Sequence, residues 1–258
     1  MPNRYYVIGD IHGSYPALEH LLANMTLDKD TYVIMCGDVG ILYGDNKMGS
    51  LLHKMVKYSC TFVVMRGNHD ARYWKRYRER GESLEVFDMW GNQMARQGKY
   101  PNVWYVRDEG GLYEVPQVGN VLFIPGAYSV DKWHRLQRGM AWEHDEQLTY
   151  AEMDALIEIA QNNYIDAVIS HTCPLSWQPQ FKDLFLDGLD QGSIENGMEK
   201  FLDVIYDIVK PTYRQWFFGH YHDDRFIFDE ADYHSPLVST PIGVMLYKYY
   251  DVLGGYLG

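Results

Sequence analysis

The sequence lacks the features that mark secreted and membrane proteins. Its three cysteines, Cys36, Cys60 and Cys173, include no CxxC pair, and its first residues contain no apolar stretch of signal-peptide length. No run approaches the ~18 consecutive apolar residues of a membrane helix. We therefore expect a soluble cytoplasmic protein without a membrane partner, whose reduced thiols behave as small apolar side chains.

Positive charge is also scarce. The chain has 23 Lys and Arg against 35 Asp and Glu, which gives a formal net charge of −12. An acidic surface does not attract long polyanions, so we do not expect long nucleic acid as a substrate. A small phosphorylated substrate (a nucleotide, or another phosphomonoester or phosphodiester) stays compatible, because bound metal ions can invert the local charge.

The chain has no internal repeat, low-complexity segment or linker, so we expect one domain over residues 1–258. Short runs rich in Val, Ile, Tyr and Phe alternate with amphipathic stretches, which is typical of βαβ units and a buried sheet. The expected strands are Tyr5–Gly9, Tyr32–Cys36, Phe62–Met65, Ala167–Ser170, Trp216–Phe218, Arg225–Phe228 and Gly243–Tyr247. The expected helices are Pro16–Met25, Met48–Tyr58, Ile194–Val209 and one from a Thr149–Glu152 capping box to Asn163.

Two further regions complete the layered α/β pattern. Residues 71–99 are rich in charge, so we expect helix or irregular structure there and treat 71–100 as a candidate cap over the site. Val103–Val106, Leu112–Val115 and Val121–Ile124 are joined by short turns, which predicts an antiparallel meander. Two sheets flanked by helices would accommodate this order of elements.

Polar side chains of the ligand type follow five of the expected strands, and a glycine lies next to most of them. In open α/β sheets, ligands bind at the carboxyl ends of strands, so one edge should collect these side chains. Glycine permits close approach of the backbone to such a site. The side chains in question are Asp10, His12, Asp38, Asn68, His69, His171, His220 and His222.

The residue types narrow the chemistry. Imidazole, carboxylate and amide oxygen suit Mn, Fe or Zn, and the absence of cysteine ligands argues against a structural thiolate zinc site. Seven of these eight side chains, all except His69, are candidate ligands, which is too many for one tetrahedral ion but suits two ions that share a carboxylate. Two such ions can hold a bridging hydroxide and the oxygens of a phosphoryl group during in-line displacement. The pattern therefore predicts hydrolysis of phosphoesters.

At these residues the chain resembles a known family. Five blocks, in order from residue 9 to residue 222, are similar to those of the calcineurin-like metallophosphoesterase superfamily: Gly9–Gly13, Gly37-Asp38, Gly67–Asp70, His171 and Gly219–His222. The resemblance implies an αββα sandwich of two mixed β-sheets flanked by helices, with a dinuclear metal site at the strand ends.

The resemblance also implies roles for single residues. Asp10, His12 and His222 would bind one metal ion, Asn68, His171 and His220 would bind the other, and Asp38 would bridge them. His69 would be the catalytic residue that protonates or stabilises the leaving oxygen, since His can donate a proton near neutral pH.

The N-terminal blocks are most similar to the phosphoprotein phosphatases and diadenosine tetraphosphatases. The chain departs from them at Ile41 and Leu42, where those enzymes have an Asp that orients the catalytic His and an Arg that clamps the phosphate. The candidate substrate-binding residues that could take over are Arg72, Arg107 and Arg135. His134 lies in a stretch, residues 128–135, that reads equally well as a substrate-facing loop or as a solvated one.

The sequence thus predicts a dinuclear metallophosphoesterase, a phosphatase or phosphodiesterase, with two divalent metal ions. Manganese is the metal we expect, and iron and zinc also fit the ligands. One alternative is a metal-binding scaffold of the same fold with weak or no turnover, which the absent Asp-Arg pair leaves open. Another is a nuclease acting on short or single-stranded substrates.

Overall fold

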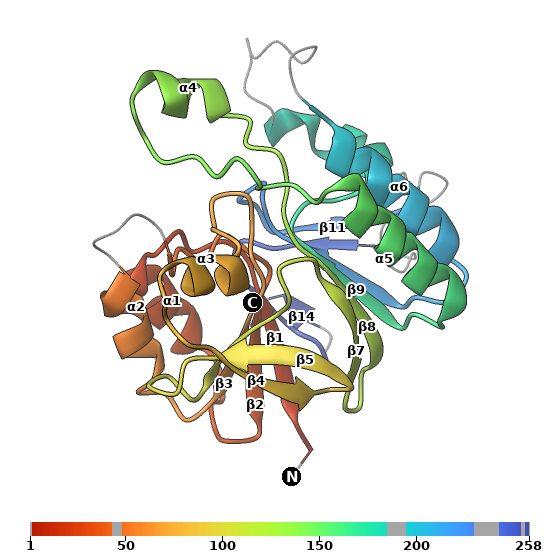
Figure 1. Ribbon diagram of the computed structural model, residues 1–258. Coiled ribbons are helices and arrows are strands. Elements are labelled where there is room, and N and C mark those ends of the chain that lie inside the picture. The colour runs from red at the N-terminus through yellow and green to blue at the C-terminus, as the bar shows by residue number, and fades with distance from the viewer. Residues whose placement is uncertain (1, 43–47, 185–194, 230–242, 254–255, 258) are drawn as a thin grey trace.

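The computed structural model describes residues 2–42, 48–184, 195–229, 243–253 and 256–257. Over these residues the chain forms two mixed sheets packed face to face, with helices on both outer faces (Figure 1). This confirms the expected αββα sandwich. In the described part of the chain, no helix is long and apolar enough to cross a membrane.

The first sheet has the strand order β14-β13-β1-β2-β3-β6-β5-β4. Its four central strands run parallel: β1 (Arg4–Ile8), β2 (Thr31–Met35), β3 (Thr61–Val64) and β6 (Val103–Tyr105). Helices cover its outer face: α1 (Tyr15–Leu22), α2 (Met48–Met55) and α3 (Tyr73–Glu79). These strands are buried on both faces, which explains why they read as continuous apolar runs.

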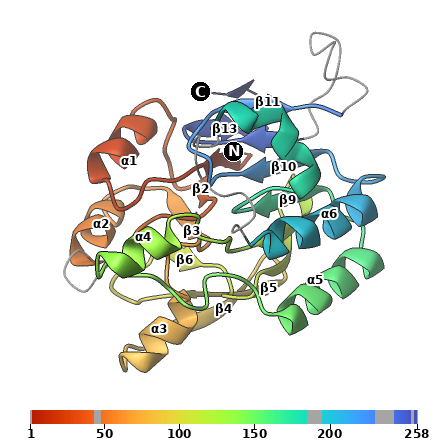
Figure 2. The ribbon, with the colours of Figure 1, turned by 90° about the horizontal axis from the view of Figure 1, so that it is seen from above.

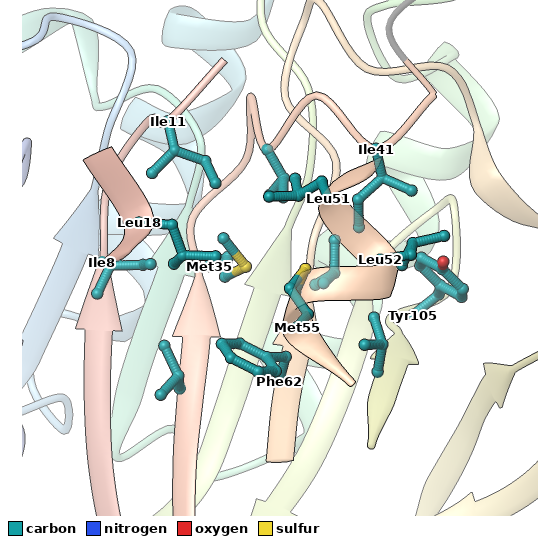
Figure 3. Packing of buried hydrophobic residues seen from close by; sticks show 14 of the residues in the cluster. Ile8, Ile11, Leu18, Met35, Ile41, Leu51, Leu52, Met55, Phe62 and Tyr105 are labelled. Carbon is teal, nitrogen blue, oxygen red and sulfur yellow. The ribbon is translucent and has the colours of Figure 1, made fainter. Parts of the chain in front are cut away.

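The outer core of this sheet lies between its strands and the helices. Figure 3 shows Met35 and Phe62 of adjacent strands facing Leu18 of α1 and Met55 of α2. Ile41 belongs to the same cluster and is fully buried. Each Å² of apolar surface removed from water stabilises the fold by about 25 cal/mol, so this packing is the main stabilising contribution. It also fixes the strand ends relative to each other.

The second sheet has the order β11-β12-β10-β9-β8-β7. Its strands are β7 (Gly111–Val115), β8 (Gly119–Ile124), β9 (Ala167–Ser170), β10 (Gln215–Phe218), β11 (Arg225–Ile227) and β12 (Gly243–Met245). Its outer face packs on α5 (Tyr150–Asn162), α6 (Gly197–Val209) and the 3₁₀ segment η1 (Leu175–Leu184). The Thr149–Glu152 capping box is confirmed, while Ile194, the expected first residue of α6, lies outside the described residues.

The structure corrects two expectations. Residues 85–96 are not helical or irregular but form the hairpin β4 (Glu85–Met89) and β5 (Asn92–Arg96) at the edge of the first sheet. The side chains of β4 are largely exposed, so no buried alternation marked it as a strand. Whether 71–100 acts as a cap stays a prediction.

The expected meander is the second correction. β6 pairs in parallel with β3 in the first sheet, whereas β7 and β8 pair with each other in the second. The short connection after β6 therefore crosses between sheets instead of forming a hairpin. Two C-terminal strands, β13 (Tyr249–Asp251) and β14 (Tyr256–Leu257), were not expected at all.

One excursion leaves this layered body. Between β8 and α5 the chain carries the short helix α4 (Lys132–Gln137) out over the side where β1, β2 and β3 end (Figure 1). Figure 2 looks down on that side, with α4 in front of the strands. We call residues 129–146 the arm.

Candidate metal centre

The ends of five parallel strands meet at one edge of the sandwich. Asp10 follows β1, Asp38 follows β2 and Asn68 follows β3 in the first sheet, while His171 follows β9 and the two histidines 220 and 222 follow β10 in the second. The sheets join at this edge through the backbone N–H of His220, which donates to both carboxylate oxygens of Asp10 at 3.0 and 3.2 Å. All seven expected ligands therefore come together.

The backbone of this edge is strained. Only six non-glycine residues among those described have positive φ, and four of them are expected ligands. Such conformations are uncommon for non-glycine residues and cluster at functional sites, where the fold enforces them. The four are His12 (φ 46°), Asp38 (φ 47°), His220 (φ 71°) and His222 (φ 55°).

Glycine is required where the loops touch. A Cβ on Gly67 would lie 2.1 Å from the Oδ1 atom of Asp38, and one on Gly219 would lie 2.2 Å from the Oδ1 atom of Asp10. No side chain fits at either position without moving a carboxylate. These glycines bring the backbones of different strand ends into contact around the two acids.

Asp10, His12 and His222 form one group of ligand atoms within 4.8 Å of each other. The Oδ2 atom of Asp10 lies 3.2 Å from His222 Nε2 and 3.8 Å from His12 Nε2. The two Nε2 atoms are themselves 2.9 Å apart. This is the set expected to hold one metal ion.

Asp10, Asp38 and His171 form a second, overlapping group. Asn68 joins it, because its Oδ1 atom lies 2.8 Å from His171 Nε2 and 3.0 Å from His220 Nδ1. His171 Nε2 is 3.6 Å from the Oδ1 atom of Asp38. Both carboxylates thus lie between the two sets of side chains.

These contacts fit a cation. His171 Nδ1 lies 2.9 Å from the carbonyl oxygen of Cys36, which can only accept, so a neutral His171 carries its proton there and turns a lone pair toward Asn68 Oδ1. Two acceptors facing each other repel unless a positive ion lies near them. Among the described residues, the buried Oδ2 atom of Asp38 accepts no hydrogen bond. Carboxylate, imidazole and amide donors suit a divalent metal ion.

The two buried carboxyls differ in their electrostatics. Burial would raise the pKa of Asp10, but its hydrogen bond with His222 and the neighbouring imidazoles outweigh burial and lower the pKa to about 2. Burial raises the pKa of Asp38 well above its usual range, and the charges of Asp10 and Asp70 add to this. An ionised Asp38 therefore needs a cation beside it.

His69 lies at the rim of this cluster. Its backbone N–H donates to Asp38 Oδ1 at 2.9 Å, and its Nε2 atom is 3.9 Å from Asp38 Oδ2. Nη2 of Arg135, in α4, lies 3.3 Å from the same Nε2 atom. Burial, and next the charge of Arg135, lower the pKa of His69 to about 3, so the imidazole is neutral at pH 7.

Of the four expected substrate-binding residues, only Arg135 is brought to the cluster. Arg72 makes a bidentate ion pair with Glu152, and Arg107 pairs with Glu109. His134 is exposed on α4. Ile41 and Leu42, which stand in place of the Asp-Arg pair, are buried in the core beneath α2, where a charged pair would be desolvated.

Sequence reasoning missed three residues that support the cluster. Asp70 accepts hydrogen bonds from the backbone N–H groups of Val39, Gly40 and Gly67 and so ties the loop after β2 to the loop after β3. Ser129 and Glu146, at the two ends of the arm, bond to each other, and Ser129 also accepts a hydrogen bond from Asn68. Asp70 lies in a recognised block, whereas nothing in the local sequence marks the other two.

Comparisons with known proteins bear on the family and the fold. The family model described as calcineurin-like phosphoesterase matches residues 4–224. A comparison with curated proteins gives no match. A solved structure of a protein not further specified aligns with 100% of this chain and 98% of its own at 13% identity and a TM-score of 0.52, which supports the fold.

Two other solved structures align with lower TM-scores. Phosphopantetheinyl hydrolase from Mycobacterium tuberculosis aligns over 100% of this chain and 99% of its own, at 12% identity and a TM-score of 0.47. A cold-active protein-tyrosine phosphatase of a Shewanella species aligns over 96% of this chain and 72% of its own, at 14% identity and a TM-score of 0.33.

Proposed function

The chain belongs to the calcineurin-like phosphoesterase family and is a phosphoester hydrolase, and we propose that it works with two divalent metal ions on a small substrate. The observation that carries this proposal is the pair of overlapping ligand groups that share Asp10 and enclose the unpartnered oxygen of Asp38. Two bound ions would supply a hydroxide nucleophile at neutral pH and charge to hold the phosphate oxygens.

The protein's own residues divide the remaining work. In the proposal, one ion is held by Asp10, His12 and His222. The other ion is held by Asn68, His171 and His220, and Asp38 lies between the two ions. Neutral imidazoles suit this task, because a metal ligand must offer a lone pair. Burial lowers the pKa of His12 and His171, which favours their neutral forms.

His69 and Arg135 would act together on the leaving side of the phosphate. Arg135 carries a permanent charge and presents N–H donors whose geometry matches phosphate oxygens. His69 is neutral without substrate, and an anionic phosphate beside it would favour the protonated form that can donate to the leaving oxygen. The proximity of the two side chains supports this role and gives the site a cation that Leu42 cannot provide.

Manganese is the ion we propose, and the ester type is left to experiment. The test uses protein purified with Mn²⁺ and compares p-nitrophenyl phosphate with bis-p-nitrophenyl phosphate. We expect wild type to hydrolyse at least one ester, Asp38→Asn to abolish turnover, and His69→Asn to lower it by about 10²–10⁴-fold. The matched controls Asp154→Asn and His20→Asn change exposed residues of the same types and should leave turnover unchanged.

The outcomes separate the rival readings. No turnover of either ester, with Mn²⁺ demonstrably bound, would favour a metal-binding scaffold and sink the enzyme proposal. Activity that survives Asp38→Asn would refute the bridging role. Preference for the diester would identify a phosphodiesterase rather than a phosphatase.

A further inference from the structure

The arm touches the metal site at its base. Ser129 and Glu146 lie at its two ends, and both are buried, with exposed fractions of 0% and 2%. Between them the arm carries α4 and Arg135 out over the strand ends. The base is therefore the place where the arm and the candidate ligand Asn68 meet.

A directed chain of hydrogen bonds runs through this base. Nδ2 of Asn68 donates to Ser129 Oγ at 2.9 Å, and Ser129 Oγ donates to Glu146 Oε2 at 2.5 Å. Ser129 N donates to Glu146 Oε1 at 3.0 Å, and Trp142 Nε1 donates to Glu146 Oε2 at 2.8 Å. Glu146 thus accepts from three donors, and both of its oxygens are used.

The direction of the chain fixes the orientation of Asn68. A serine hydroxyl has one hydrogen, and Ser129 gives it to Glu146. Its oxygen can therefore only accept from Asn68, so the amide nitrogen must face Ser129. The amide oxygen then faces His171 Nε2 and His220 Nδ1, where a metal ion would take it as a ligand. A flipped amide would present two hydrogens to that ion instead.

We propose that Ser129 and Glu146 are positioning residues of the metal centre, which act through Asn68 and couple the arm to metal binding. The inference rests on the proposed function, because it takes Asn68 as a ligand. Residues around a metal site that orient its ligands typically contribute 10–100-fold to metal affinity. The same hydrogen bonds hold the two ends of the arm together. The position of Arg135 and the orientation of Asn68 therefore both depend on the carboxylate of Glu146.

Glu146→Gln is the sharpest perturbation. Glutamine offers one oxygen where three donors converge. With its amide nitrogen in the place of Oε1, it would meet the N–H of Ser129. With the amide nitrogen in the place of Oε2, the glutamine would meet the N–H of Trp142 and would donate a hydrogen bond to Ser129. The Ser129 hydroxyl would then turn its hydrogen toward Asn68, which favours the flipped amide of Asn68. Either arrangement weakens the metal site.

The experiment measures Mn²⁺ affinity by titration calorimetry of metal-free protein, alone and without substrate. We expect Ser129→Ala and Glu146→Gln to bind Mn²⁺ at the affected site 10–100-fold more weakly than wild type. The double variant should lose little more than either single variant, because the two residues act in one chain. Excess Mn²⁺ should restore turnover. Glu143→Gln is the matched control, since Glu143 lies on the same arm but pairs with Arg76.

Several outcomes overturn the inference. Wild-type Mn²⁺ affinity in folded Ser129→Ala and Glu146→Gln would do so, as would an equal loss in Glu143→Gln. If Glu146→Gln fails to fold, Ser129→Ala, which removes one oxygen atom, decides alone. Wild type that binds Mn²⁺ but hydrolyses neither ester overturns the proposed function and not this inference. Wild type that binds no Mn²⁺ overturns both.

Discussion

Replacement of Asp38 by Asn should have opposite effects on stability with and without metal. The Asp38 side chain is buried, and its Oδ2 atom accepts no hydrogen bond among the described residues. An unsatisfied buried polar group costs about 1–3 kcal/mol, and more when it is charged. Asparagine keeps the acceptor for the backbone N–H of His69 and puts a neutral amide in place of the carboxylate, so the repulsion from Asp10 and Asp70 is removed. Metal-free Asp38→Asn should therefore be more stable than metal-free wild type by about 1–3 kcal/mol.

With metal present the order should reverse. Each site at a free Mn²⁺ concentration of 100 times its Kd stabilises the folded state by about 2.7 kcal/mol, so two sites contribute about 5 kcal/mol to wild type. For a chain of this length about 1 kcal/mol corresponds to roughly 2 °C in Tm. We expect Mn²⁺ to raise the Tm of wild type by about 10 °C and that of Asp38→Asn by far less.

Thermal denaturation monitored by circular dichroism, in EDTA and in Mn²⁺, measures all four values. Metal-free Asp38→Asn should melt about 2–6 °C above metal-free wild type. The exposed variant Asp154→Asn should follow wild type in both buffers. If Asp38→Asn lowers the Tm equally with and without Mn²⁺, the carboxylate serves the fold and not a metal ion, and the reasoning fails.

Three further predictions concern other parts of the molecule. Arg135→Ala should weaken inhibition by inorganic phosphate by about 10–100-fold, because hydrogen bonds to charged groups are worth about 1.5–3 kcal/mol. The control variant Arg138→Ala, which changes an exposed arginine, should not weaken it. Equal inhibition constants for wild type and Arg135→Ala would exclude Arg135 from phosphate binding. Burial raises the pKa of Glu199 from 4.5 to about 7, so its contribution to stability is present below pH 4.5 and is lost as pH rises through about 7. In urea unfolding, the free energy of unfolding of wild type should fall by about 3 kcal/mol relative to that of Glu199→Gln as pH rises over that range. A difference between the two proteins that stays constant with pH would contradict the raised pKa. Gly67→Ala should cost about 2 kcal/mol or more in the same assay, because its Cβ would lie 2.5 Å from a backbone nitrogen, whereas Gly197→Ala, whose nearest neighbour is 3.7 Å away, should cost nothing.

The sequence alone predicted the architecture and the edge of the sheets at which the candidate ligands meet. Strands buried on both faces read as apolar runs, and the polar residues that follow them share one placement, so Asp10, Asp38 and Asn68 could be assigned to one edge before any contact was known. The apolar runs and the polar residues that follow them can both be read from short stretches of sequence, and the folded structure keeps both arrangements. The same reasoning failed for β4, whose exposed side chains carry no periodic signal.

Only the tertiary structure decided which residues meet. The contact between His12 and His222 joins positions 210 residues apart, and no local pattern records that the two sheets pack with these ends together. Leu42 marked an absent cation, but three arginines could have replaced it until packing placed Arg135 beside His69. The chain from Glu146 through Ser129 to Asn68 was likewise hidden, because hydrogen-bond direction depends on positions in space and not on distance along the chain.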